Sequence, residues 1–311
     1  MIMSLSKKKL LIAGLPILCW LSLHAQKSEV LPGDDLEEQM EEPLDMVTED
    51  GPGNEWLIAP IPGRNPTFGW TVTLPVAYLY HPKGGDPGNP PWITGIIAFY
   101  AENDSWAGGA FHRMNLARDR YRLGGSVIYT DVVYNYYGSG ESGAGDDRYL
   151  ELNQTYGIGF LEGKVRVADN LYAGIRIMGM STTLEDIRVP DLDIDFPDLV
   201  EGLKMQIFDL VPKIEYDTRD NEFYPRRGSY ILAQVNISAE GWGSDFDYQI
   251  YEASWNQYFT LAENQVLACR LAGKYASGDV PFFKLPAVGQ DGDFRGYVMG
   301  RYRDKVLFSS Q

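Results

Sequence analysis

The chain has 311 residues, with 43 acidic and 27 basic side chains and a formal net charge of -16. Negative charge in this excess disfavours nucleic acid as a partner, because the phosphate backbone is itself polyanionic. Cys19 lies in an expected leader, which leaves Cys269 as the one cysteine of the mature chain and excludes an intramolecular disulfide.

Residues 1–26 have the features of a secretory signal peptide. Lysines at positions 7–9 precede an apolar run over residues 10–23, and Ala25 provides the small residue of a cleavage site. The run is shorter than the roughly 20 residues that a membrane-spanning helix needs. We therefore expect the segment to be removed after export, and a retained membrane anchor is the disfavoured alternative.

Residues 27–55 form an acidic segment, which we expect to be a disordered periplasmic arm. It contains eleven acidic residues and one basic residue, Lys27, and so carries -10 of the net charge of -16. With three prolines, three glycines and no usable periodicity, it cannot bury enough apolar surface to offset the entropy of ordering. A solvated tail is the simpler interpretation, and an acidic ligand for a basic partner is the alternative.

From position 56 onward, apolar and polar residues alternate with the period of β-strands. Between positions 229 and 242, for example, Ile231 and Val235 fall on one face, and Gln234 and Asn236 fall on the other. The alternation predicts eleven strands, at residues 56–63, 69–80, 92–101, 106–117, 122–137, 154–167, 171–185, 205–218, 228–241, 248–260 and 265–277.

Two all-β folds fit this alternation: a soluble β-sandwich and a transmembrane antiparallel β-barrel. Many of the predicted strands reach ten residues or more, beyond the roughly five or six usual in globular sheets. Aromatic residues gather at strand ends, as at Tyr134 and Tyr136, and charges such as Glu162 fall where a polar lumen would be. With the export signal, these features favour a barrel over residues 56–311, in the outer membrane of a Gram-negative bacterium, with outer-membrane lipid as a partner.

The order of the strands predicts the side on which each connection lies. If the chain enters the barrel from the periplasm, the connections after odd-numbered predicted strands are extracellular. The long connections 138–153 and 186–204 then fall outside and the short ones inside, as outer-membrane barrels require. The Pro/Gly-rich stretch 81–91 is the exception, because it falls on the periplasmic side.

A tight turn follows the predicted strand 205–218. Asp and Asn side chains there can bond the local backbone, Pro presets φ, and a final Gly has no Cβ to strain the turn. The segment resembles the DTRDN-x-FYP-x-x-G turn of the BamA/TamA surface-antigen family; an ordinary polar hairpin is the alternative, and the expected role is structural in both cases. The motif residues of this periplasmic turn are Asp217, Arg219, Asp220, Asn221, Phe223, Tyr224, Pro225 and Gly228.

A second motif follows the last complete predicted strand, after the segment 281–286. It consists of Phe294, Arg295, Gly296 and Tyr297, followed by Gly300, Arg301, Tyr302, Arg303 and Asp304. It resembles the long sixth extracellular loop of the same family. The resemblance implies that the loop folds back into the lumen and that its arginine pairs with acidic groups on the inner wall, where a guanidinium can form bidentate bonds.

The sequence departs from the family in three ways. The periplasmic POTRA domains of many members have no counterpart here, so we expect no POTRA-mediated partners. Gln290 stands where a glycine commonly precedes the loop signature. The resemblance implies a 16-stranded barrel, of which about eleven strands and a stub at residues 305–311 are present. Because an open sheet would leave backbone groups unpaired in lipid, we expect a C-terminally truncated chain.

The function implied by the resemblance is insertion or translocation of outer-membrane or secreted proteins, with such unfolded chains as clients. The alternatives are a passive barrel plugged by its loop and a non-functional gene fragment. We expect no enzyme, because the sequence has no Gly-x-Ser-x-Gly elbow and no His with Ser and Asp at recognisable spacing. His81 and His112 lie in no metal-ligand spacing, so no metal and no cofactor are expected.

Overall fold

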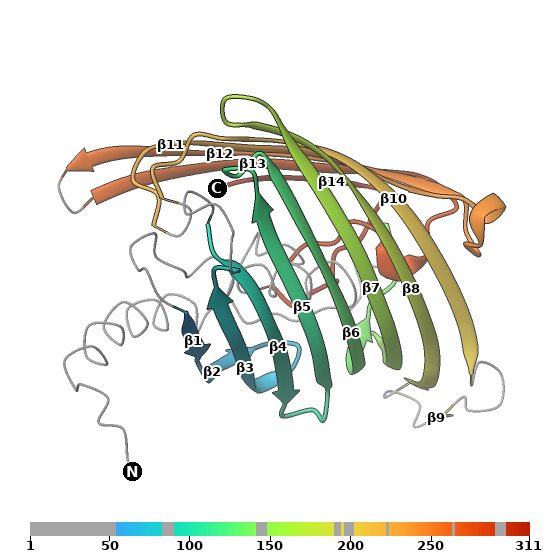
Figure 1. Ribbon diagram of the computed structural model, residues 1–311. Helices are drawn as coiled ribbons and strands as arrows, with labels where there is room; N and C mark the ends of the chain where they lie inside the picture. The colour runs from blue at the N-terminus through green and yellow to red at the C-terminus, as the bar shows by residue number, and fades with distance from the viewer. Residues whose placement is uncertain are drawn as a thin grey trace, which may run out of the picture.

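The computed structural model describes residues 54–82, 90–140, 148–189, 194–195, 202–221, 224–262, 265–289 and 297–311. Its strands form one antiparallel sheet that curves around a concave face (Figure 1). The strands are β1 (Glu55–Ile58), β2 (Ile61–Asn65), β3 (Gly69–Tyr80), β4 (Trp92–Ala101), β5 (Trp106–Leu116), β6 (Tyr121–Tyr136), β7 (Leu150–Ala168), β8 (Leu171–Val189), β9 (Ile194–Asp195), β10 (Leu203–Asp217), β11 (Gly228–Ser238), β12 (Tyr248–Ala262), β13 (Gln265–Gly278) and β14 (Val306–Ser310). Two short 3-10 helices, η2 (Glu240–Trp242) and η3 (Phe282–Lys284), lie in the connections.

The predicted all-β antiparallel fold is confirmed. Each of the eleven predicted strands has an observed counterpart, and the main strands pair in chain order from β3 to β14. Within the described residues, β1 and β2 pair with β3 and β14 pairs with β13, so the two edges of the sheet are not joined to each other. The predicted segments 1–26 and 27–53 lie outside the described residues.

The first predicted strand, 56–63, was wrong in one respect, because the structure divides it into β1 and β2. Both pieces pair with β3 in one continuous register, with Ile58 opposite Val76 and Ile61 opposite Thr73. Between them, Ala59 donates its N–H to the carbonyl of Pro75 at 3.3 Å. Pro75 cannot return that bond and Pro60 cannot donate one, so the ladder is interrupted at this point.

β7 and β8 extend beyond their predicted ends, into residues that we expected to be extracellular loop. Their added residues pair in register, and Glu151 opposes Arg188 with 3.6 Å between carboxylate and guanidinium. Leu152 and Ile187 oppose each other and pack in the core of the concave face, while Glu151 and Arg188 lie on the other face, so the alternation continues. A β-bulge shifts its phase on β8, because Asn153 opposes Asp186 whereas Gln154 opposes Leu184. The backbone pairing nevertheless continues, because hydrogen bonds between strands do not depend on side-chain type.

The two faces of the sheet differ in polarity. Large apolar side chains are exposed on the convex face of successive strands, with Leu161 the most exposed at 72%. Others include Val127, Ile175, Ile177, Ile214, Ile231, Trp255, Leu271 and Tyr275. Alternate residues of the same strands point to the concave face, where Tyr156, Val132 and Ile207 are buried. This is the arrangement expected of a barrel wall between lipid and lumen.

Candidate functional site

The connection between β13 and β14 lies within the curve of the sheet (Figure 1). Its helix η3 places Phe282 against Tyr136, with 5.0 Å between ring centroids, and Phe283 against Tyr156, with 6.1 Å. Phe283 is 2% exposed. We name residues 279–305 the inner loop; its described residues are 279–289 and 297–305. Apolar burial holds its first half on the concave face.

A buried ion pair connects the inner loop to the wall of the sheet. The Lys284 ammonium lies 3.7 Å from Oδ2 of Asp209 on β10, and the two side chains are 2% and 0% exposed. The hydroxyl of Tyr248 on β12 donates to Oδ1 of the same carboxylate at 2.8 Å. Charges buried this deeply require partners, so the pair fixes where η3 can lie.

Sequence reasoning missed both members of this pair. The motif pointed instead to Arg295, which lies, with Phe294 and Gly296, outside the described residues. One signal was available: Asp209 interrupts the apolar face formed by Ile207 and Val211 on the same strand. A charge on an otherwise apolar strand face requires a buried partner.

The second half of the inner loop returns beside the first. Ala287 forms a β-bridge with Arg303, and the Arg303 guanidinium donates to the carbonyl of Phe282 at 2.5 Å. That guanidinium lies 5.7 Å from the ring centre of Tyr136. Gly300 has φ of 68°, and a Cβ there would lie 2.6 Å from Nη2 of Arg303. A glycine at this position therefore permits the close packing of Arg303.

The remaining loop-motif residues lie around this turn. Arg301 stacks over Tyr137 of the connection after β6 at 5.3 Å. Tyr297 and Tyr302 contact each other with 5.9 Å between centroids, and Asp304 donates its N–H to the carbonyl of Pro286. The structure thus brings together Tyr297 and residues 300–304 of the predicted motif.

The predicted turn motif connects β10 and β11. Arg219 forms two bonds with Asp217, from Nε to Oδ1 at 3.0 Å and from Nη2 to Oδ2 at 2.8 Å, and it stacks over Tyr230 at 4.5 Å. Gly228 has φ of 103°, and a Cβ there would lie 2.2 Å from the carbonyl oxygen of Thr218. The Asp217–Arg219 pair lies at the β10 end of the turn, and Gly228 permits close approach of the backbone at the β11 end.

Two further motif side chains satisfy backbone donors within the turn. Asn221 accepts from the N–H of Tyr224 at 2.9 Å, and Asp220 accepts from the N–H groups of Arg226 and Arg227 at 2.9 and 3.2 Å. Desolvation raises the pKa of Asp220, but these backbone donors outweigh it and hold the pKa below the usual range. Pro225 is half-buried, and Phe223 lies outside the described residues.

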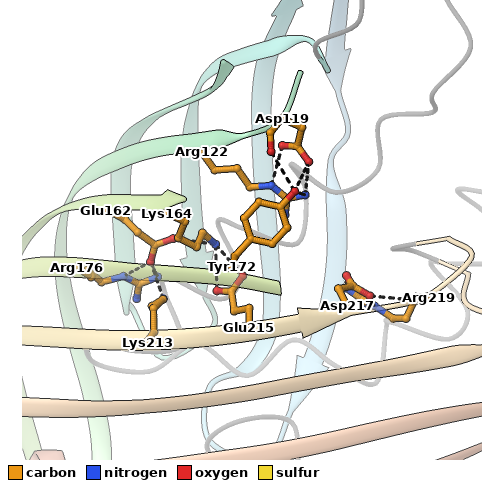
Figure 2. A network of polar contacts seen from close by, with 10 residues as sticks. All are labelled: Asp119, Arg122, Glu162, Lys164, Tyr172, Arg176, Lys213, Glu215, Asp217 and Arg219. Atoms are coloured by element: carbon orange, nitrogen blue, oxygen red, sulfur yellow. Dashed lines mark hydrogen bonds and ion pairs between the residues drawn. The ribbon is translucent and has the colours of Figure 1, made fainter. Parts of the chain in front are cut away.

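A network of charged side chains lies on the concave face near the turns after β5, β7 and β10 (Figure 2). Glu162 on β7 is its centre: its carboxylate contacts Arg176 at 2.9 Å, Lys213 at 2.5 Å and Lys164 at 3.0 Å. Lys164 also contacts Glu215 at 3.0 Å. The prediction that charges occupy the lumen side of β7 agrees with this placement.

The network continues to the turn between β5 and β6. Arg122 forms two bonds with Asp119, at 2.8 and 2.6 Å, and lies 4.0 Å from the ring centre of Tyr172, whose hydroxyl donates to the same carboxylate at 2.6 Å. Burial raises the pKa of Asp119, but the bonds and charge of Arg122 outweigh burial and keep the pKa below its usual range. Asp119 is therefore ionised at neutral pH.

Comparison with known proteins identifies a family and similar solved structures. A family model for the Omp85 superfamily domain matches residues 98–310. The crystal structure of BamA from Haemophilus ducreyi lacking POTRA domains 1-3 is similar in fold, with a TM-score of 0.51 and 15% sequence identity. The similarity covers 90% of this chain and 57% of that chain. No curated protein matches the sequence. In the described ranges, no helix is long and apolar enough to cross a membrane.

Proposed function

The chain belongs to the Omp85 superfamily, and we propose on this basis that it acts in the outer membrane, in the insertion or translocation of outer-membrane or secreted proteins. Its substrates would be unfolded client chains, and its solvent on the convex face would be outer-membrane lipid. The family match carries the proposal, because it covers most of the chain, from β4 to β14.

The arrangement of side chains supports a barrel wall in lipid. Exposed apolar residues such as Leu161 and Trp255 lie on the convex face, while Glu162 and Lys213 lie on the concave face. In water, so many exposed apolar side chains on one face would promote association, whereas in lipid they are solvated. No catalytic group is needed for the insertion of a client, which gains its free energy from its own folding.

Insertion activity can be measured with the purified full-length chain refolded in liposomes. An unfolded porin held by a periplasmic chaperone would be added, and its folding followed by its heat-resistant migration in gels. We expect faster porin folding than in empty liposomes. Liposomes containing an unrelated barrel protein are the control, and a rate no greater than in either control would refute the insertion function.

A passive barrel plugged by its inner loop is the second candidate, and the burial of Phe283 and Lys284 favours it. Such a barrel would conduct little current until the loop is displaced. Conductance in planar bilayers separates the candidates: Lys284→Met should raise conductance if the loop is a plug. If the same variant changes only the rate of porin folding, the loop serves insertion instead.

A further inference from the structure

The concave face carries a belt of mostly basic residues near the turns after β5, β7 and β10. Cross-strand register places many of them in one row that crosses the sheet from β5 to β13: Asn115, Arg122, Lys164, Gly174, Lys213, Gln234, Glu252 and Lys274. The row therefore contains four cations and one carboxylate.

The neighbouring positions continue this excess of positive charge. The strands carry eight basic and four acidic residues on the concave face, either in this row or two to four residues from it along the same strand. We name these residues the basic belt: Arg113, Arg122, Lys164, Arg166, Arg176, Lys213, Arg270 and Lys274, with Glu162, Glu215, Asp217 and Glu252.

Ion pairs inside the belt neutralise part of its charge, but four positive charges remain in excess. The side chains of Lys164, Arg176 and Lys274 are 16, 12 and 13% exposed, so a small part of each reaches solvent beside the carboxylate that it pairs with. Low-dielectric walls strengthen the field of such a cluster and concentrate anions at it. The belt is thus positively charged in a chain whose net charge is -16.

We propose that the basic belt binds the acidic segment of the same chain, residues 29–50. That segment contains ten carboxylates and no basic residue, so its charge is opposite to that of the belt. Its tethering to the barrel raises its concentration at the belt above that of any free anion of equal affinity. The bound segment occupies the lumen at the end where the turns lie.

Register also places the start of the barrel beside the belt. Glu55 of β1 pairs with Leu79, Leu79 stands beside Ile93, and Ile93 stands beside Arg113. Asp50 precedes Glu55 by only five residues, a span of at most about 18 Å when extended. The 22 residues from Glu29 to Asp50 can extend up to about 75 Å, which is enough to cross the concave face.

Carbodiimide cross-linking of the full-length chain in micelles or liposomes tests the contact, because the reagent joins a carboxylate to a neighbouring lysine amine with loss of water. Trypsin leaves the acidic segment in one peptide, between Lys27 and Arg64. We expect this peptide to be joined to Lys164, Lys213 or Lys274. Lys204 is the internal control, because it lies near the start of β10, at the opposite end of that strand from Lys213.

An electrostatic contact must also respond to salt and to the charge of the belt. We expect the cross-link yield to fall at least about threefold between about 0.05 and about 0.5 M salt. The double variant Arg113→Gln/Arg166→Gln keeps all three reactive lysines and should lower the yield similarly. Arg188→Gln, on an exposed arginine at the opposite end, is the matched control and should leave the yield unchanged.

A second readout does not depend on lysine chemistry. Replacing the ten carboxylates of residues 29–50 by amides leaves the sequence of every described strand unchanged and should raise bilayer conductance and anion selectivity, since the belt is then uncovered. The same replacement at Asp146 and Asp147 is the control. Cross-links that favour Lys204, or none to the belt, would overturn the proposal, as would conductance that the amide variant leaves unchanged. Cross-links that form only in liposomes of neutral lipid would mean that anionic lipid occupies the belt instead of the segment, and this result would also overturn the proposal.

Discussion

Removing either charge of the buried Lys284–Asp209 pair should destabilise the protein far more than removing a charge from an exposed pair with a similar distance between the charges. Nζ of Lys284 lies 3.7 Å from Oδ2 of Asp209, and the side chains of Lys284 and Asp209 are 2% and 0% exposed. Lys284→Met keeps much of the side-chain volume but removes the ammonium that faces the buried Asp209 carboxylate, which also accepts from the Tyr248 hydroxyl. Loss of one partner of a buried pair costs about 3–5 kcal/mol.

The double variant Lys284→Met/Asp209→Asn should recover most of that loss. An amide at position 209 can still accept from Tyr248, and it removes the buried negative charge that faced the lysine, so the two substitutions are strongly non-additive. We expect an interaction free energy of about 2–3 kcal/mol in the double-mutant cycle. Urea unfolding of the liposome-refolded protein, followed by tryptophan fluorescence, measures each corner of the cycle.

The Glu151–Arg188 pair provides a matched control. Its charges are 3.6 Å apart, almost the same separation, but the arginine is 58% and the glutamate 35% exposed. Arg188→Met should therefore change the free energy of unfolding by no more than about 1 kcal/mol. If Lys284→Met costs as little as Arg188→Met, or if the Lys284 and Asp209 substitutions simply add, the inner loop is not held by this ion pair.

Three other substitutions test the turns and the core of the inner loop. Gly228→Ala places a Cβ 2.2 Å from the Thr218 carbonyl oxygen at φ of 103° and should lower the free energy of unfolding by about 3 kcal/mol or more. Gly243→Ala has the same φ but open space around the added Cβ, so it measures the contribution of φ alone. Equal losses of stability in the two variants would contradict a steric clash at Gly228. Phe283→Ala should cost about 3–5 kcal/mol in urea unfolding, and retention of wild-type stability would mean that η3 is not buried. Because its pKa is lowered in the folded state, Asp119 contributes stability at pH above its unfolded value of 3.8, and this contribution is lost as the pH falls through the lower folded value. Stability profiles between pH 2 and pH 6 should show that loss in the wild type and not in Asp119→Asn; identical profiles would exclude it.

Much of the strand order follows from the sequence because side chains on a strand alternate between two environments. The prediction for β3, residues 69–80, matches the structure to the residue, and that for β4, residues 92–101, does too. Alternation is harder to follow where a β-bulge shifts its phase, as on β8 between Leu184 and Asp186. It also cannot show an interruption such as that between β1 and β2, because Pro60 matters only once Pro75 stands near it on the partner strand.

The amino-acid sequence was enough to predict an all-β protein with two distinct strand faces, a turn motif at 217–228 and a loop motif after 278. Those features are local, since alternation and turn chemistry depend on neighbours in the chain. The folded structure was needed to show that Lys284 meets Asp209, that Glu162 contacts three cations, and that belt residues of five strands share one row. These contacts depend on cross-strand register and on how the inner loop folds back, which join residues far apart in the sequence.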